Sequence, residues 1–153
     1  NYRIMGLSNV YGTGDAGFSK KKNALQYMIN RLKNDLPVDL YYNGNFYRDY
    51  MHVFDTCNAI NTVIEKSSLN ETYNIGSGKG VLMKDIIKKC IYLTGSKSKI
   101  TSIDSPEFHK IVQVKDMYMD TTKLENLGFS QKISLEEGLK KLCQAWKKLS
   151  KAL

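Results

Sequence analysis

Three alternating glycines stand where a phosphate group could bind. The segment "TYNIGSGKGVLMKDIIKKC", residues 72–90, leads from a short apolar run through Gly76, Gly78 and Gly80 into an amphipathic helical pattern. A dinucleotide fingerprint needs its third glycine three residues after its second, and a P-loop needs Ser or Thr directly after Gly-Lys. Val81 and Gly80 occupy these two positions instead. The spacing therefore favours a plain joint between a strand and a helix over a phosphate cradle.

The cysteines and histidines do not follow a metal-binding pattern. Cys57, Cys90 and Cys143 are odd in number and widely spaced, and each lies within a helical apolar pattern. Such cysteines are more often buried free thiols than members of a disulfide or a metal cluster. His52 and His109 show no ligand spacing either. We therefore expect no metal site.

The chain has the composition of one soluble globular domain. Of its 153 residues, 42% are hydrophobic and 25% are charged, which is ordinary for a domain with a single core. No apolar run approaches the ~20 residues of a membrane span, and the first residues lack the pattern of a signal peptide. These features predict a cytoplasmic protein that does not span a membrane.

The formal net charge of +8 admits anionic partners such as nucleic acid, an acidic membrane surface or a phosphorylated small molecule. Much of the excess lies in "LKKLCQAWKKLSKAL", residues 139–153, where most lysines fall off an apolar stripe. A second cluster, Lys20 to Lys22, has no interleaved aromatic residues of the kind that stack on bases. Solvated helix faces explain both clusters, so nucleic-acid binding is not favoured.

Alternating periodicities of about 2 and 3.6 residues predict an α/β domain without internal repeats. The turn "NGN", residues 43–45, is typical of a tight hairpin between two strands. Asp55 and Asp120 are expected to cap helices, and Ser134 with Glu137 matches a capping box. Helices are expected at about residues 20–34, 54–66 and 83–94, after Asp120 and after Ser134, and extended segments at residues 2–12, 38–42, 46–53, 71–76, 97–104 and 110–120.

Four segments of the chain, in order, match motifs that occur together in one enzyme family. "SNVYGTG" resembles N-V-Y-G-P-G, and "LYYNGNFYRDYMHVFDTCNAI" resembles Y-G-D-G-x-x-x-R-D-F-I-H-V-x-D-x-x-x-A-I. "YNIGSGKGVLMKDI" is similar to Y-N-I-G-S-G before a helix, and "DTTKLENLGFSQKISLEEGLKKL" to D-x-x-K-x-x-x-L-G-F-x-P-x-x-x-L-E-E-G-L. The family is that of the extended short-chain dehydrogenase/reductases, the nucleotide-sugar epimerases and dehydratases. The resemblance implies that residues 1–153 are the C-terminal, substrate-binding part of such an α/β enzyme, lacking the N-terminal Rossmann half.

The resemblance also implies residues that bind a nucleoside-diphosphate sugar. Asn9 matches an asparagine that hydrogen-bonds near the sugar-diphosphate, and Asn23 falls near another substrate-contacting position. Tyr41 takes the place of the residue that packs on the nucleotide base, with ordinary strand packing as the alternative. Arg48 carries a planar guanidinium whose paired donors fit a pyrophosphate. Pairing with a carboxylate such as Asp49 is the alternative for Arg48.

The chain departs from the family motifs at several positions around this site. Gly6, Thr13 and Tyr42 replace an arginine, a proline and a glycine of the motifs. A second phosphate-binding arginine often precedes the D-x-x-K element. In this chain His109 or Lys110 must substitute for that arginine, or no residue does.

The elements that carry the family's chemistry are missing. Hydride exchange between a sugar carbon and a nicotinamide cofactor needs a G-x-x-G-x-x-G loop and a Tyr-x-x-x-Lys pair. None of the ten tyrosines has a lysine four residues later. The resemblance therefore implies that NAD(P) and the homodimer interface belong to the absent half, and that this chain alone has no catalytic residue and is inactive. We also expect apolar surface around Ile4, Leu7 and Ile75 to be exposed or covered by neighbouring molecules.

Two other functions stay open. A free-standing nucleotide or nucleic-acid binding module would use the basic surface without catalysis. A degenerate structural homologue would bind no ligand. The sequence also leaves open which base and sugar are recognised and which of the family's reactions follows.

Overall fold

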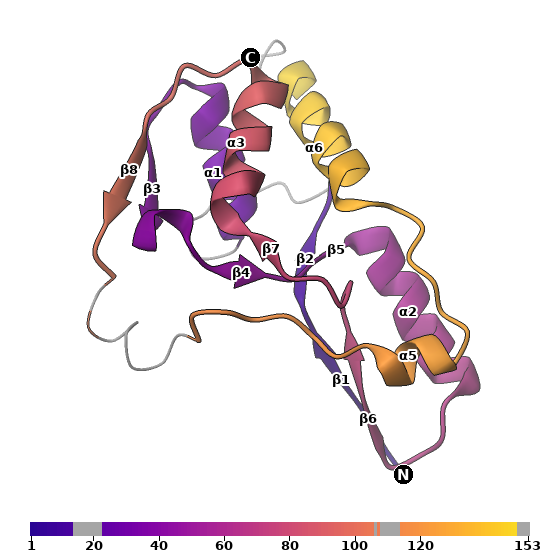
Figure 1. Ribbon diagram of the computed structural model, residues 1–153. Helices are drawn as coiled ribbons and strands as arrows, with labels where there is room; N and C mark the ends of the chain where they lie inside the picture. The colour runs from indigo at the N-terminus through magenta and orange to yellow at the C-terminus, as the bar shows by residue number, and fades with distance from the viewer. Residues whose placement is uncertain (14–22, 106, 108–113, 150–153) are drawn as a thin grey trace.

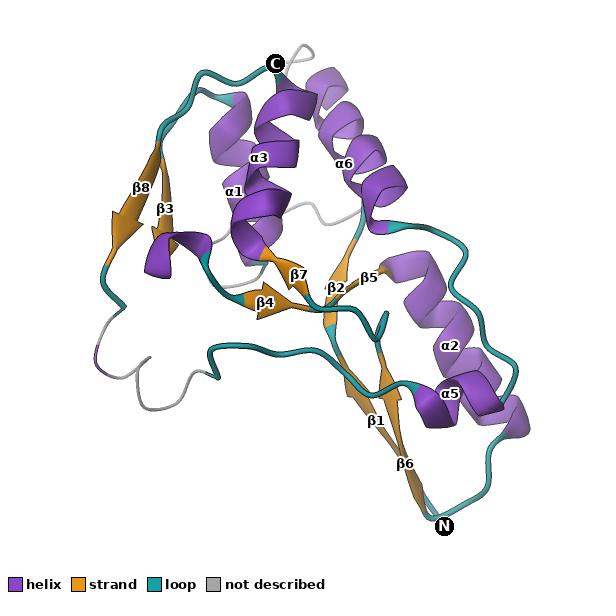
Figure 2. Cartoon of the chain, in the orientation of Figure 1, coloured by secondary structure: helices purple, strands orange, loops and turns teal. Residues whose placement is uncertain are grey.

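The computed structural model describes residues 1–13, 23–105, 107 and 114–149, and it shows a mixed α/β fold (Figure 1). Short strands alternate with helices along the chain, as the periodicities predicted (Figure 2). The elements in chain order are β1 (Arg3–Leu7), β2 (Asn9–Tyr11), α1 (Ala24–Lys33), β3 (Val38–Tyr41), the 3-10 helix η1 (Tyr42–Gly44), β4 (Tyr47–Arg48), β5 (Tyr50–His52), α2 (Val53–Lys66), β6 (Glu71–Ile75), β7 (Val81–Leu82), α3 (Met83–Thr94), β8 (Ile100–Ile103), α5 (Thr122–Asn126) and α6 (Leu135–Leu149).

The strands form two-stranded ladders in the part of the chain that the structure describes. β1 pairs with β6, β2 with β5 and β3 with β8, all in parallel, whereas β4 and β7 are antiparallel. The β3–β8 ladder lies beside α1 at one end of the molecule, where α3 and α6 pack next to α1, and the β1–β6 ladder lies beside α2 and α5 at the other (Figure 1). The short strands β2, β4, β5 and β7 connect these two ends.

Each end of the molecule has its own apolar core. The larger core lies where α1, α3 and α6 meet β3, and it includes the fully buried Ile29, Ile87 and Leu142. The smaller core packs α2 and α5 against β6 through residues such as Val63 and Ile75. The larger core therefore fixes α1 relative to β3, the two elements that border the pocket described below.

The predicted hairpin at residues 43–45 is wrong. β3 and β5 pair with β8 and β2 instead of with each other, and Tyr42–Gly44 form a 3-10 turn. Asn43 and Gly44 do adopt the positive φ angles that a tight turn needs, 54° and 73°. Such angles can also end a strand, and a Cβ at Gly44 would lie 2.8 Å from the Lys84 Cβ. The turn residues thus predicted the backbone angles but not the strand that β3 pairs with.

The helix-cap predictions are confirmed at Ser134 and wrong at Asp55. The backbone amide of Ser134 donates to the Glu137 carboxylate at 3.0 Å, and the amide of Glu137 donates to Ser134 Oγ at 3.2 Å, as in a capping box. His52, rather than Asp55, caps α2, because its Nδ1 accepts from the amide of Phe54 at 3.2 Å. Asp55 is buried and accepts from two backbone amides just before Ser134. Its carboxylate therefore joins two segments of the fold.

Other local predictions are met in part. Asp120 accepts from the amide of Thr122 at 3.0 Å but stands one residue before the N-cap of α5. Cys90 and Cys143 are buried thiols outside any disulfide, as predicted, whereas Cys57 is exposed. The burial prediction fails at Cys57 because α2 turns this position away from the smaller core.

The expected apolar surface is present at two of its three positions. Ile4 is 54% exposed and Leu7 is 47% exposed, but Ile75 is 1% exposed because it packs into the smaller core. None of the described helices has the length and apolar content needed to cross a bilayer. Among the described residues, no group of three or more His, Cys, Asp or Glu side chains could hold a metal ion.

Candidate functional site

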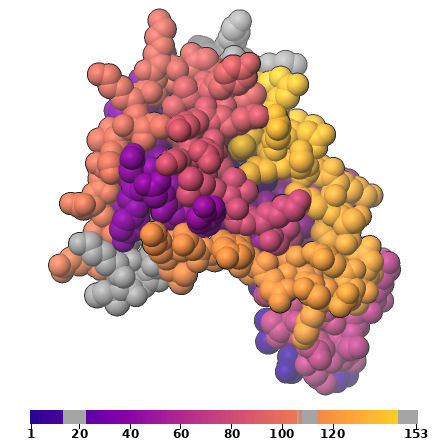
Figure 3. Space-filling model, viewed as in Figure 1, coloured from indigo at the N-terminus to yellow at the C-terminus, as the bar shows by residue number. Residues whose placement is uncertain are grey.

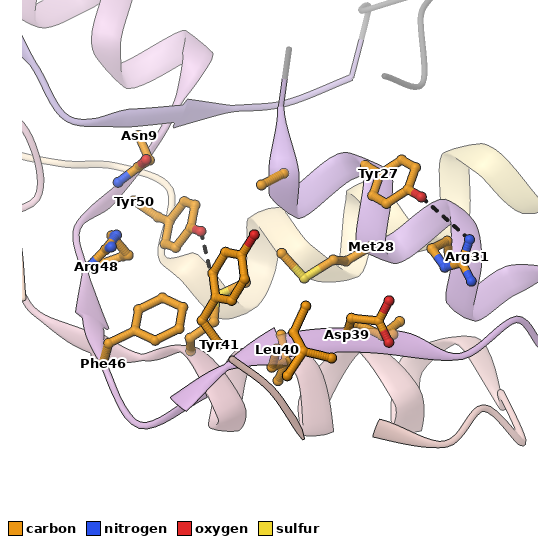
Figure 4. Close-up of a pocket in the computed structure, with 14 residues that line it drawn as sticks. Asn9, Tyr27, Met28, Arg31, Asp39, Leu40, Tyr41, Phe46, Arg48 and Tyr50 are labelled. Atoms are coloured by element: carbon orange, nitrogen blue, oxygen red, sulfur yellow. Dashed lines mark hydrogen bonds between the residues drawn. The ribbon is translucent and has the colours of Figure 1, made fainter. Parts of the chain in front are cut away.

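A pocket of about 720 Å³ lies between α1 and the strands β2 to β5. Asn9 and Arg48 stand at one end, Tyr27 and Arg31 at the other, and Tyr41 between them (Figure 4). The pocket is lined by Asn9, Ala24, Tyr27, Met28, Arg31, Val38, Asp39, Leu40, Tyr41, Phe46, Arg48, Tyr50, Met83 and Ile103.

Arg48 presents a cation at the first end. Its Nη1 donates to the carbonyls of Tyr47 at 2.8 Å and Lys115 at 2.5 Å, and its Nη2 donates to the carbonyl of Val114 at 3.2 Å. The guanidinium carbon lies 4.6 Å from the centre of the Phe46 ring. Burial lowers the pKa of Arg48, and no ion pair joins it to another described residue. Because neutral carbonyls hold the guanidinium, its charge is available to an anion in the pocket.

Asp49 follows Arg48 in the chain, but its side chain is buried in the interior and does not line the pocket. It is 0% exposed. Its carboxylate accepts from the amides of Ser77 at 2.9 Å, Gly78 at 3.1 Å and Met119 at 3.3 Å, and from the Ser77 hydroxyl at 2.6 Å. The amides of the glycine-rich turn therefore bind a carboxylate of the protein itself, in agreement with the prediction that this turn is no phosphate cradle.

Residues 114–121, here called the strap, form hydrogen bonds with both Arg48 and Asp49. The strap crosses the face of the molecule next to β4 (Figures 1 and 3). The amide of Asp49 donates to the carbonyl of Met117 at 3.0 Å, and the amide of Met117 donates to the carbonyl of Tyr47 at 3.0 Å. Asp49 thus holds the strap from the interior, while carbonyls of the strap hold the Arg48 guanidinium at the pocket.

Asn9 and Tyr41 line the same pocket as Arg48. Nδ2 of Asn9 donates to the carbonyl of Asp49 at 2.9 Å, which uses one of its two amide hydrogens. Tyr41 stands half-buried at the end of β3, and its ring lies between the two ends of the pocket (Figure 4). The fold therefore brings together three of the predicted residues from three different strands.

Of the two other predicted residues, Asn23 does not line the pocket, and Lys110 cannot be placed. Asn23 is the N-cap of α1, where its Oδ1 accepts from the amide of Gln26 at 3.2 Å. Its Nδ2 donates to the carbonyl of Val10 at 3.1 Å. These bonds give Asn23 a role in positioning α1. Lys110, like the alternative His109, lies outside the described residues.

Some lining residues were not singled out from the sequence. Nε of Arg31 donates to the carbonyl of Pro37 at 2.5 Å, and its guanidinium carbon lies 5.8 Å from the Tyr27 ring centre. Tyr27 and Arg31 are four residues apart and share a face of α1, and Asp39 and Tyr41 share a face of β3. These spacings can be recognised in the sequence. However, only the packing of α1 against β3 shows that this face of the helix and this face of the strand border the same pocket. The residues missed in this way are Tyr27, Arg31, Asp39 and Phe46.

The chain is similar to several known proteins. Residues 1–76 match the model of the NAD dependent epimerase/dehydratase family. A putative UDP-glucose 4-epimerase of Methanocaldococcus jannaschii is 32% identical over 150 residues, which cover 92% of this chain and 44% of that protein. The crystal structure of UDP-glucose 4-epimerase from Thermotoga maritima with UDP-glucose is 28% identical with a TM-score of 0.81, covering 97% of this chain and 47% of that one.

A third protein agrees in fold. The dTDP-glucose 4,6-dehydratase of Bacillus anthracis, solved in complex with NAD, has a TM-score of 0.82 and 24% identity, and the match covers 97% of this chain and 45% of that one. The predicted fold class, that of extended short-chain dehydrogenase/reductases, is therefore confirmed. The chain spans less than half the length of each of these three proteins.

Proposed function

We propose that this chain is the C-terminal, substrate-recognising part of an NAD(P)-dependent nucleotide-sugar epimerase or dehydratase. The convergence of Asn9, Tyr41 and Arg48 on one pocket carries this proposal. Arg48 binds the diphosphate oxygens with its planar donors, and Asn9 adds a donor without charge. Tyr41 offers its ring to the base. The nucleotide-sugar enzymes among the relatives support the substrate class.

The chemistry of the whole enzyme would lie outside the described residues. A nicotinamide cofactor would supply the oxidation of the sugar to a keto intermediate, which is then epimerised, dehydrated or otherwise remodelled. The amides of the glycine-rich turn bind Asp49, so this turn does not fit a cofactor pyrophosphate. We therefore assign no cofactor contact and no catalytic residue to this chain and expect it to be inactive alone. A cytoplasmic homodimer is expected of the whole enzyme.

Calorimetric titration of the chain with UDP, dTDP, GDP and CDP tests this function. At least one of these nucleotides is expected to bind, and Arg48→Ala should weaken that binding about 100-fold, since two charge-assisted hydrogen bonds of about 1.5 kcal/mol each are lost. Arg48→Lys keeps the charge without the planar fork and should lose about 10-fold.

Arg3→Ala is the matched control, because it removes a guanidinium that is bonded to Ser67 outside the pocket. Its affinity should equal that of the unchanged chain. Salt-sensitive binding of oligonucleotides without preference for diphosphates would instead indicate a nucleic-acid binding module. The absence of any nucleotide binding would favour the degenerate homologue.

A further inference from the structure

The end of the pocket remote from Arg48 carries the carboxylate of Asp39. Asp39 is exposed on β3, and its side chain forms no hydrogen bond or ion pair with any other residue that the structure describes. Successive side chains of a strand leave on opposite faces, so Asp39 and Tyr41 share one face while the buried Val38 and Leu40 share the other. A flat ring stacked on Tyr41 would therefore have one edge close to Asp39.

Helix α1 supplies the opposite wall at this end. Nη1 of Arg31 lies 3.4 Å from the Tyr27 hydroxyl, and its Nε is bonded to the carbonyl of Pro37. These contacts hold the guanidinium in place, and its Nη2 has no partner among the described residues. Figure 4 shows Asp39 on β3 and Arg31 on α1 at the same end of the pocket. At this end of the pocket, the Asp39 carboxylate on β3 thus offers acceptor oxygens, and the Arg31 guanidinium on α1 offers donors in a fixed position.

We propose that this end of the pocket reads the nucleotide base and selects guanine. The inference rests on the function proposed above, in which the diphosphate lies at Arg48 and the base on Tyr41. A carboxylate can only accept hydrogen bonds. Guanine presents two adjacent donors, N1–H and the exocyclic amino group, which the two oxygens of Asp39 accept in parallel. The neighbouring O6 of guanine is an acceptor that suits the Arg31 guanidinium.

The other bases fit this end less well. Uracil and thymine present a single N–H between two carbonyl oxygens, and a carboxylate repels those oxygens. Adenine and cytosine present an amino group beside a ring nitrogen that is itself an acceptor. The two positions on β3 are about 7 Å apart along the strand, which is comparable with the long dimension of a purine. The pocket volume of about 720 Å³ is within the usual range for a ligand of this size.

Calorimetry with GDP, UDP, dTDP, CDP and ADP tests the base preference. The unchanged chain is expected to bind GDP at least ~10-fold more tightly than the other four nucleotides. Asp39→Asn replaces one acceptor with a donor at nearly constant shape. This variant should lose the preference for GDP and gain affinity for CDP and ADP, whose edges pair a donor with an acceptor.

Two controls accompany the variant. Asp104→Asn removes the same charge from an exposed position just after β8 that does not line the pocket, and it should leave the order of affinities unchanged. Thermal unfolding of each variant checks that the fold is retained. Asp39 is exposed, so the substitution is expected to leave the unfolding temperature nearly unchanged.

The outcomes separate this inference from the function on which it rests. If UDP or dTDP binds more tightly than GDP and the binding needs Arg48, the base assignment is overturned while the proposed function stands. If Asp39→Asn weakens every nucleotide by the same factor, or every one except dTDP, then Asp39 binds the ribose and the base assignment is again overturned. If no nucleoside diphosphate binds at all, both proposals fall.

Discussion

Arg48 and Asp49 are adjacent in the chain, yet the side chain of Arg48 lines the pocket, whereas that of Asp49 is buried in the interior. Arg48 is held by backbone carbonyls, and no carboxylate among the described residues pairs with its charge. Asp49 is fully buried, and four protein donors satisfy its carboxylate. A buried charge with a complete set of partners stabilises the fold, whereas a charge that is held without being neutralised is available to a ligand. The difference predicts opposite effects of substitution in the two regions.

Asp49→Ala should give the largest effect on stability. It leaves three amides and a hydroxyl without their acceptor, and we expect the free energy of unfolding to fall by about 3 kcal/mol or more. Urea unfolding measures this change. Asp39→Ala is the matched control, because that carboxylate is exposed and its loss should change stability by no more than about 0.5 kcal/mol. Equal losses for the two variants would remove the distinction between the regions.

Gly78→Ala should give the next largest effect, about 2 kcal/mol. The residue has a φ of 70°, and an added Cβ would lie 2.6 Å from Oγ1 of Thr121. Gly95→Ala is a close control, since Gly95 has a φ of 66° but no atom within 4 Å of the added Cβ, and it should cost about 1 kcal/mol from backbone strain alone. The difference between the two variants in the free energy of unfolding, measured with denaturant, gives the cost of crowding in the glycine-rich turn that binds Asp49. If the two losses are the same, the turn accommodates the methyl group.

Ser77→Ala should have a smaller effect, about 1 kcal/mol. It removes the hydroxyl that donates to Asp49 at 2.6 Å, while the three backbone donors remain. Ser130→Ala, at an exposed position with no described side-chain hydrogen bond, should leave the unfolding midpoint unchanged. A loss at position 77 no greater than at position 130 would show that the amides alone satisfy the carboxylate.

Arg48→Ala should change stability least, by less than about 1 kcal/mol, because water can replace the guanidinium at the carbonyls that it leaves. The same variant is expected to lose about 100-fold in affinity for the nucleotide. Urea unfolding beside calorimetry measures both quantities on one sample. If Arg48→Ala destabilised the fold as much as Asp49→Ala, the main role of Arg48 would be to fix the strap and not to bind a ligand.

The features that could be predicted from the sequence are local ones. The end of α3 at Gly95 and the capping box of Ser134 and Glu137 depend on residues within four positions of each other, and the structure confirms both. The α/β class followed from alternating periodicities in the same way. Asn9, Tyr41 and Arg48 came from motifs rather than from physics, and the structure places them on one pocket.

The features that could not be predicted depend on distant partners. The pairing of β3 with β8 joins segments about 60 residues apart, and no turn signal reports it. The opposing placement of Arg31 and Asp39 depends on how α1 packs against β3. Asp55 has the sequence context of a helix cap, but the two amides that it accepts from lie in a distant loop. Propensity within a short window contains none of this information.

The contrast among the three thiols makes the chain suitable for site-selective labelling. Cys57 is exposed on α2, whereas Cys90 and Cys143 are buried in the larger core. A hydrogen bond with Cys143, together with burial, raises the pKa of Cys90 and keeps it in the unreactive protonated form. A maleimide dye should therefore attach to Cys57 alone under native conditions. Because α2 does not line the pocket, a dye at Cys57 would leave the site open to a nucleotide.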